Sequence, residues 1–301
     1  MNPRSVTTFM VQVSDNRKIN VRRMGCGPEV LLLVHGFGEN SYAWGDVSED
    51  ITSSFTVFAV DLQGHGDSDW NPQGRYSIEG FASDLTAVIN YMDIDSLSVI
   101  GHSMGADVAL CLTSMLSKQV AKLVLAEFSL TTLSGEVRDF FLAQFNAQFR
   151  RYQSVSEFTV LLQQQRPLAD EVALLQYSSN AIRPTHRCDY EMKCDPKVQG
   201  IYQGDEQSLL AQQRIAIAKL SCPLLLVRGS GSAIVTASAM RDIAITARYA
   251  KMQSVHGAGH AVMLDRPKEF YDVISSFLLP HNAQRATFTL HRQHSKYPSN
   301  T

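Results

Sequence analysis

Short runs of apolar residues recur along the chain and alternate with longer segments of helical spacing. Several runs are continuous, such as LLLV at 31–34 and LVLA at 123–126. Strands buried on both faces of a parallel sheet have this pattern, whereas strands with one face in water alternate apolar and polar residues. The runs predict strands at Thr7–Val13, Ile19–Arg23, Val30–Val34, Thr56–Val60, Leu97–Ile100, Leu123–Ala126 and Leu224–Val227.

Amphipathic segments lie between the predicted strands. In one of them Phe81, Leu85 and Val88 recur at spacings of three and four residues, so they share one helix face. The first two strand candidates alternate more, which favours an antiparallel edge. Strand–helix alternation is typical of a doubly wound α/β sheet. Helices are predicted at Ile78–Met92, Met104–Leu116, Ala237–Ala247 and Lys268–Leu279.

The alternation stops between about Ser129 and Gln213, a stretch rich in glutamine, aromatic residues and helical spacing. Because it lies between two sheet strands, we expect a helical cap, inserted after the sixth strand and packed above the sheet. The predicted organisation is a core of residues 1–128 and 214–280, a cap of 129–213 and a tail of 281–301. The tail is polar and weakly patterned, so we expect it to be mobile or lightly docked.

Composition excludes several classes of protein. The 301 residues are 45% hydrophobic and 19% charged, which argues against disorder and coiled coil. The net charge of −2 lacks the basic excess of a nucleic-acid-binding protein. No apolar run reaches the roughly 18 residues of a membrane span, and the N-terminus has no signal-peptide h-region. The five cysteines are scattered and never form C-x-x-C, so we expect reduced thiols in a soluble, cytoplasmic protein.

The strongest chemical signal is the G-x-S-x-G segment from Gly101 to Gly105, with Ser103 at its centre. It directly follows the predicted strand LSVI and precedes a predicted helix, the context that this motif requires. A serine between strand and helix occupies a sharp, strained turn, and flanking glycines let the backbone approach closely. The helix N-terminus directs amide donors at the site. Ser103 is therefore the candidate nucleophile.

Other motifs follow predicted strands in the same way: HGFG at 35–38, DLQGHGDS at 61–68 and GAGH at 257–260. With these motifs the chain resembles the α/β-hydrolases from about Ile19 to Leu279. The resemblance implies the α/β-hydrolase fold: a mostly parallel, doubly wound sheet with a helical cap. The matching segments are VLLLVHGFGENSYAW, VFAVDLQGHGDSD, VIGHSMGADVAL, LVLAEF, PLLLVRGS and GAGHAVMLDRP.

The resemblance also implies roles for individual residues. Ser103 is the nucleophile and His260 its base, because a serine hydroxyl is weak without an adjacent base. The backbone N–H groups of Phe37 and Met104 form the oxyanion hole. Relatives that use an aspartate nucleophile, such as haloalkane dehalogenases and epoxide hydrolases, are excluded by the serine.

The resemblance requires neither a cofactor nor a metal. The glycines of HGFGEN do not form G-x-G-x-x-G, and no Walker A sequence is present. His35 and His65 match structural positions at loop starts, and His102 flanks the nucleophile. Asp265 lies at the start of the final helix, where we expect a structural role.

The third member of the triad departs from the family pattern. The family places an acid after the strand that here is Pro223–Val227, as G-x-x-D or as G-x-x-S-D. The first spacing selects Ser232 and the second selects Ala233, and neither side chain ionises. The acid fixes the histidine tautomer and stabilises the imidazolium, and its loss lowers turnover about 10⁴-fold.

Three explanations remain open at the level of sequence. Glu127, at the end of LVLAEF, has replaced the acid from the neighbouring strand. Alternatively, an Asp-to-Ala change at Ala233, natural or engineered, has left little activity. In the third, the site performs chemistry that tolerates a dyad, such as acyl transfer or cyclisation, or only binds a ligand.

The expected function is a serine hydrolase that cleaves a small carboxylic ester, lactone or thioester through an acyl-enzyme. The alternatives are a catalytically silent binding protein and a biosynthetic acyltransferase or cyclase. The expected partner is a small molecule with a hydrophobic acyl group, unless the aromatic residues of the cap only pack its helices together. Those aromatic residues include Phe140, Phe141, Phe145, Phe149 and Phe158.

Overall fold

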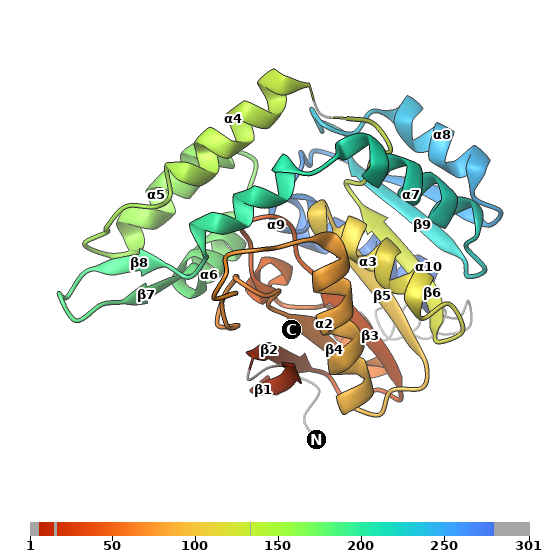
Figure 1. Ribbon diagram of the computed structural model, residues 1–301, viewed down its shortest axis with the longest axis horizontal. Helices are drawn as coiled ribbons and strands as arrows, with labels where there is room; N and C mark the ends of the chain where they lie inside the picture. Colours follow the sequence, from red (N-terminus) through yellow and green to blue (C-terminus); the bar gives the residue numbers. More distant parts are fainter. Residues whose placement is uncertain (1–5, 15–16, 133, 280–301) are drawn as a thin grey trace, which may run out of the picture.

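The computed structural model describes residues 6–14, 17–132 and 134–279. Its main sheet has eight strands in the order β1-β2-β4-β3-β5-β6-β9-β10 (Figure 1). The strands are β1 (Thr7–Ser14), β2 (Arg17–Met24), β3 (Glu29–Val34), β4 (Phe55–Val60), β5 (Leu97–His102), β6 (Val120–Ala126), β9 (Leu224–Gly229) and β10 (Ala250–Val255). The pairs β1–β2 and β2–β4 are antiparallel and all other neighbours are parallel. The mostly parallel α/β sheet with an antiparallel edge is therefore confirmed.

Helices cover both faces of the sheet. One face carries α2 (Ile78–Tyr91), α3 (Met104–Met115), α7 (Glu206–Ala218) and α8 (Ala237–Thr246). The other carries the 3₁₀ helix η1 (Ser41–Trp44), α1 (Glu49–Ser54), α9 (Val262–Asp265) and α10 (Pro267–Leu278). Within β3, Leu32 and Val34 pack with the first group, while Leu31 and Leu33 pack with the second. Burial on both faces is the physical cause of the continuous apolar runs.

The predicted strand list lacked β10. This strand, AKMQSV, is exposed along most of its length at the edge of the sheet. An edge strand in water needs no apolar run, so hydrophobic patterning does not detect it.

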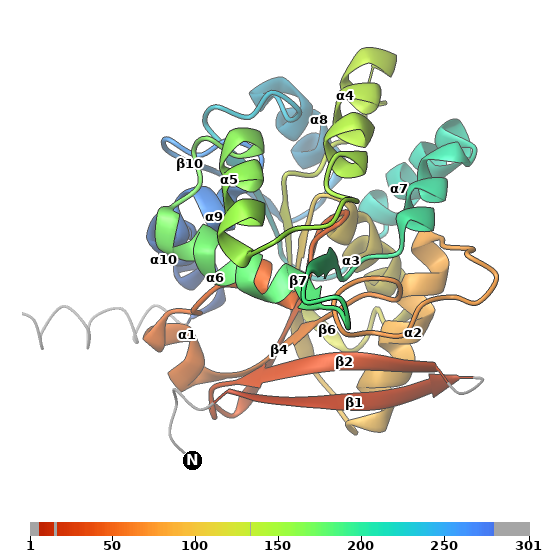
Figure 2. The same cartoon turned by 90° about the vertical axis from the view of Figure 1, so that its left-hand side faces the viewer.

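The insert between β6 and β9 contains α4 (Gly135–Asn146), α5 (Val155–Gln165), α6 (Glu171–Ala181) and the 3₁₀ helix η2 (Pro196–Gln203). Both views place α4 and α5 at the opposite end of the molecule from β1 (Figures 1 and 2). The insert is mainly helical, and it also contains a two-stranded antiparallel sheet, β7 (Ile182–Pro184) and β8 (Tyr190–Met192), which the sequence did not predict. Strands of three residues are too short to produce a buried run.

The expected limit between residues 213 and 214 falls inside α7, a helix that packs on α3 and α8. The tail expected at 281–301 lies outside the described residues. All five cysteines are unpaired in the structure. Among the described helices, none combines the length and apolar character needed to cross a bilayer.

Two glycines fix how closely α3 approaches the sheet. A Cβ atom on Gly105 would lie 2.3 Å from the carbonyl oxygens of Val34 and His35. A Cβ on Gly101 would lie 2.2 Å from the carbonyl oxygen of Gly105. Because these contacts are with backbone atoms, no side-chain movement relieves them, and the position of the intervening Ser103 depends on both glycines.

We expect Gly105→Ala to lower the free energy of unfolding by about 2 kcal/mol or more, since overpacking against backbone forces the helix to shift. Urea unfolding followed by circular dichroism measures this. The matched control is Gly135→Ala in α4, where nothing lies within 4 Å of the new methyl group. Equal stability of the two variants would show that α3 does not need its close approach.

Candidate active site

Ser103 lies in the tight turn between β5 and α3. Its φ of 51° and ψ of −124° are strained for a residue with a Cβ. The turn is held from both sides. The Ser103 N–H donates to the carbonyl of Ala126 at 2.9 Å, and the Ala106 N–H donates to the carbonyl of Ser103 at 2.7 Å. The side chain of Ser103 consequently lines the cavities at the carboxyl ends of the parallel strands.

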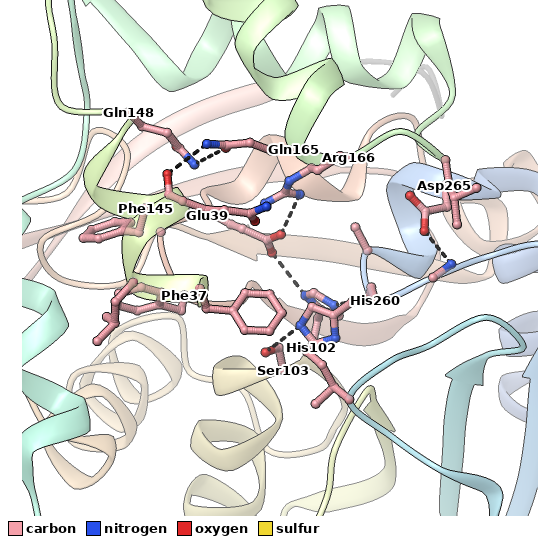
Figure 3. A pocket seen from close by; sticks show the side chains of 18 of the residues that line it. Phe37, Glu39, His102, Ser103, Phe145, Gln148, Gln165, Arg166, His260 and Asp265 are labelled. Carbon is pink, nitrogen blue, oxygen red and sulfur yellow. Dashed lines mark hydrogen bonds and ion pairs between the residues drawn. The ribbon is translucent and has the colours of Figure 1, made fainter. Parts of the chain in front are cut away.

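His260 lies between Ser103 and Glu127. Its Nε2 is 3.1 Å from Ser103 Oγ, a contact visible in Figure 3, and its Nδ1 is 2.9 Å from Glu127 Oε2. An ionised carboxylate only accepts hydrogen bonds, so Nδ1 carries the proton and the Nε2 lone pair faces the serine hydroxyl. The three side chains form the carboxylate–imidazole–hydroxyl chain of a nucleophile with an oriented base.

Glu127 follows β6 with a φ of 54°, the left-handed region. Its N–H donates to the carbonyl of Val227 at 2.8 Å, so the pairing of β6 with β9 continues into this residue. The carboxylate is fully buried. Its Oε1 accepts from the Gly229 N–H at 2.7 Å, and its Oε2 accepts from Ser232 Oγ at 2.5 Å as well as from His260. The structure therefore places a buried carboxylate with three hydrogen-bond partners beside the histidine.

The two positions that the family pattern selected for the acid lie in the loop after β9. Ser232 does not contact His260 but donates to Glu127, while its oxygen accepts from the N–H groups of Ile234 and Val235 at 3.2 and 3.0 Å. Ala233 is exposed. Of the residues considered for the acid, the structure brings Glu127 into hydrogen-bond contact with the histidine.

Phe37 and Met104, the expected oxyanion residues, both adjoin Ser103. Phe37 follows β3 and lines a cavity together with Ser103, and Met104 begins α3. Among the described residues, no acceptor takes the backbone N–H of either one. The Phe37 ring packs on Phe145 and Tyr202, at centroid distances of 4.5 and 4.9 Å. Two residues whose backbone N–H groups have no acceptor in the described part of the chain therefore line cavities together with Ser103.

Two cavities meet at Ser103. The first, of about 240 Å³, lies beneath the insert and is lined by Phe37, Phe141 and Phe145, together with Gln148 and Gln165 (Figure 3). The second, of about 420 Å³, lies between α3, α7 and η2. Ser103, Arg138, Tyr202 and Ile234 line both cavities.

The aromatic residues expected to form an acyl pocket have different environments. Phe141 and Phe145 line the first cavity, and the Phe141 ring lies 5.8 Å from that of His260. Phe149 packs on Phe145, Phe158 is buried against Tyr152, and Phe140 is 58% exposed. Two of these rings therefore line the cavity, whereas Phe149 and Phe158 pack against other aromatic rings of the insert.

A charged network that sequence reasoning missed lies beside the catalytic candidates. Arg166 at the end of α5 donates to Glu39 Oε1 at 2.9 Å, and Glu39 Oε2 is 3.2 Å from His102 Nδ1 (Figure 3). His102 Nε2 is 2.8 Å from the carbonyl oxygen of His260. The position of Glu39 directly after HGFG was the available signal. Arg166 had none, because 127 residues separate it from Glu39.

His35 and His65 hold the loops after β3 and β4. His35 Nε2 accepts from the Leu62 N–H at 3.0 Å, and His65 Nε2 accepts from the Gly38 N–H at 3.3 Å. Burial lowers the pKa of His35 to about 4 and that of His65 to about 3, so both act as neutral acceptors. Asp265 Oδ2 accepts from the Gly259 N–H at 2.7 Å and so supports the loop of His260.

Asp107 is a carboxylate on the second cavity. It lies on α3 and accepts from Gln213 Nε2 at 2.8 Å. Burial raises the pKa of this carboxyl from 3.8 to about 7. The folded protein therefore holds the proton more tightly than the unfolded chain, and the protein loses stability as the pH rises from about 4 to about 7.

We expect Asp107→Asn, which keeps an acceptor for Gln213, to raise the free energy of unfolding at pH 8 by about 1 kcal/mol or more. At pH 4, where the folded wild-type carboxyl is protonated, the two proteins should differ little. Urea unfolding at the two pH values measures the difference. A variant that is no more stable than the wild type at pH 8 would contradict the burial of this charge.

Comparisons with known proteins agree with this architecture. Residues 29–267 match the sequence profile of a family described as alpha/beta hydrolase fold. The chain is 24% identical over 260 residues to a 2-(acetamidomethylene)succinate hydrolase of Mesorhizobium japonicum, covering 86% of this chain and 91% of the relative. It is 26% identical over 263 residues to an esterase of Mycobacterium tuberculosis, covering 84% of each.

Uncharacterized proteins of Mycobacterium tuberculosis and Mycobacterium bovis are 38% identical over 104 residues, which span 35% of this chain and only 30% of theirs. Among solved structures, the crystal structure of E-2-(acetamidomethylene)succinate hydrolase superposes with a TM-score of 0.81 at 23% identity, covering 91% of this chain and 99% of that one. The Mycobacterium tuberculosis esterase gives a TM-score of 0.73 at 26% identity, covering 92% of each. Since the profile match spans most of the sequence and the expected fold is observed, the chain belongs to the alpha/beta hydrolase family.

Proposed function

We propose that the protein is a serine hydrolase that cleaves a carboxylic ester, lactone or thioester through an acyl-enzyme on Ser103. The observation that carries this proposal is the continuous chain from Ser103 Oγ through His260 to the buried Glu127, with contacts of 3.1 and 2.9 Å. Two similar proteins, named as a hydrolase and as an esterase, support the reaction class.

In the proposed mechanism each group has one step. His260 Nε2 takes the hydroxyl proton as Ser103 Oγ forms a bond to the carbonyl carbon. The carbonyl electron pair moves onto oxygen, where the N–H groups of Phe37 and Met104 stabilise the charge. The imidazolium then gives its proton to the leaving group as the acyl–leaving-group bond breaks. In the second half-reaction the same nitrogen takes a proton from a water molecule as the water oxygen forms a bond to the acyl carbon. The bond from the acyl carbon to Ser103 Oγ then breaks, and the imidazolium returns its proton to Ser103 Oγ, which frees the acid product and the serine.

Glu127 is the acid of this triad. Its carboxylate orients the Nδ1–H of His260 and stabilises the imidazolium that forms in each half-reaction. The donors Gly229 N–H and Ser232 Oγ hold it in place, so no acid is required at position 233. The contact of this carboxylate with His260 Nδ1 favours a relocated acid over a broken triad, because a carboxylate at that place orients the imidazole and stabilises its positive charge.

The first cavity is the proposed acyl site. Its aromatic wall of Phe37, Phe141 and Phe145 favours an apolar acyl group, and its volume of about 240 Å³ suits a small one. The amide side chains of Gln148 and Gln165 bond each other at 2.9 Å across the cavity wall. The proposed partner is thus a small molecule with a short hydrophobic acyl chain.

We expect a fluorophosphonate to label the unaltered chain rapidly and Ser103→Ala not at all, as measured by intact mass. Glu127→Gln keeps the shape of the side chain but loses its charge, so labelling should slow by about 10³- to 10⁴-fold. Inertness of the unaltered chain to several probes of suitable size would overturn the proposed function.

The control for the acid is Ala233→Asp. Because Ala233 is exposed and His260 already has a carboxylate partner, this variant should change the labelling rate less than about threefold. Slow labelling of the unaltered chain that rises by orders of magnitude in Ala233→Asp would instead show a triad broken at that position. Glu127 would then lose its assigned role.

We expect Phe141→Ala to lower kcat/KM for p-nitrophenyl butyrate about tenfold and to affect p-nitrophenyl acetate much less. Removing the ring exposes roughly two methylene groups of bound acyl chain, worth about 1–2 kcal/mol. The matched control is Phe140→Ala, its exposed neighbour. Equal losses with both esters would place the acyl chain elsewhere.

A further inference from the structure

His102 has a hydrogen-bond acceptor at each ring nitrogen. Nδ1 lies 3.2 Å from Glu39 Oε2, and Nε2 lies 2.8 Å from the carbonyl oxygen of His260. An ionised carboxylate and a backbone carbonyl have lone pairs and no proton to offer. A neutral imidazole has one N–H, so at one of the two contacts the lone pair of a ring nitrogen would face the lone pair of an oxygen. Only the doubly protonated ring donates a hydrogen bond to both oxygens.

We propose that His102 is a buried imidazolium and a positioning residue, which ties the backbone of His260 to the loop that carries Phe37. The positioning role rests on the proposed function, because it takes His260 to be the base. The protonation of His102 does not depend on that function, since it follows from the contacts of its two ring nitrogens.

The charges around His102 compensate its own. Glu39 lies between His102 and Arg166, and its Oε2 also accepts from the Gly36 N–H at 3.0 Å. The side chains of His102 and Glu39 are 1% and 3% exposed. Burial alone would raise the pKa of the Glu39 carboxyl, but the charges of His102 and Arg166 hold it well below its ordinary value. The cluster therefore contains two cations that share one anion.

The groups that face His102 from its other neighbours also favour its charge. Burial by itself would lower the pKa of His102, but the charge and hydrogen bond of Glu39, the His260 carbonyl and the charge of Glu127 raise it above its ordinary value. Asp265 from α9 adds a further carboxylate nearby. His35 is neutral, and the repulsion from Arg166 is offset by the intervening Glu39.

Two anchors consequently hold the base. Glu127 fixes the ring of His260 and His102 fixes its backbone, with the two imidazole rings 5.0 Å apart. The second anchor joins three loops: that after β3 through Glu39, the nucleophile turn through His102, and the loop after β10. Arg166 extends it into the insert. A base misplaced by about 1 Å loses on the order of 10²-fold in rate, so an anchor on the backbone matters to the reaction.

Nitrogen-15 NMR of histidine-labelled protein tests the charge directly. Both His102 ring nitrogens should keep protonated chemical shifts at pH 8, where an exposed histidine is neutral, and these signals should vanish in His102→Gln. In Glu39→Gln the attraction is lost, so one nitrogen should move to the unprotonated position at pH 8. An unprotonated His102 nitrogen in the unaltered chain at pH 8 would overturn the proposal.

Two substitutions at His102 separate positioning from packing. In His102→Gln the side-chain amide nitrogen takes the place of Nε2, so a donor for the His260 carbonyl remains. In His102→Asn the amide nitrogen takes the place of Nδ1, so a donor remains for Glu39 alone. We expect fluorophosphonate labelling of the Asn variant to be at least about tenfold slower than that of the Gln variant. Thermal unfolding of both reports any general loss of structure.

Equal labelling rates of the two variants would overturn the positioning role. If the Asn variant fails to fold, the effects of His102→Gln on kcat and on KM decide instead. This variant keeps the donor for the His260 carbonyl but loses the contact with Glu39 that holds that donor in place, so positioning predicts a loss in kcat. A loss confined to KM would overturn the positioning role. Resistance of the unaltered chain to labelling would contradict the proposed hydrolase activity. The NMR spectrum would still determine the charge of His102, so the failures of the two proposals can be told apart.

Discussion

The buried carboxylate of Glu127 is the constraint on which the site depends. An ion excluded from water destabilises a protein unless hydrogen-bond donors or an opposite charge compensate it. Here the donors come from the last residue of β9, the loop after it and the loop of His260. They converge only when β6 and β9 pair in the observed register, which continues through the bond from Glu127 N–H to Val227. The parallel sheet and the geometry of the reacting groups are therefore set together.

The neighbouring positions of β6 and β9 explain how the acid can come from either strand. Both strands end at the same edge of the sheet, and a glutamate has one more methylene group than an aspartate. The loop after β9 carries Ser232, whose hydroxyl donates to the carboxylate of Glu127 and whose oxygen accepts two backbone N–H groups. One of the two positions that the family pattern selects for the acid therefore supports the carboxylate that we propose as the acid.

Sequence reasoning reached the features that short-range patterns encode. Continuous apolar runs located the buried strands, because both faces of the sheet are covered. Motifs at strand ends located Ser103 and His260, because parallel strands bring their carboxyl ends together. The sequence left the identity of the proposed acid undecided. The side chain of Glu127 reaches His260 from a left-handed backbone conformation, and a residue other than glycine gives no sequence signal for that conformation. The Glu39–Arg166 pair joins the core to the insert across 127 residues, and no local pattern records such a contact.

The meeting of two cavities at Ser103 bears on the order of events in the turnover that we propose. A substrate that fills both cavities would, once cut at Ser103, leave one fragment in each, with the acylated fragment attached and the other free to depart. Because the two cavities have only Ser103, Arg138, Tyr202 and Ile234 in common among their lining residues, the first fragment would leave without movement of the second. The emptied cavity would then give the incoming nucleophile its own route to the carbonyl carbon.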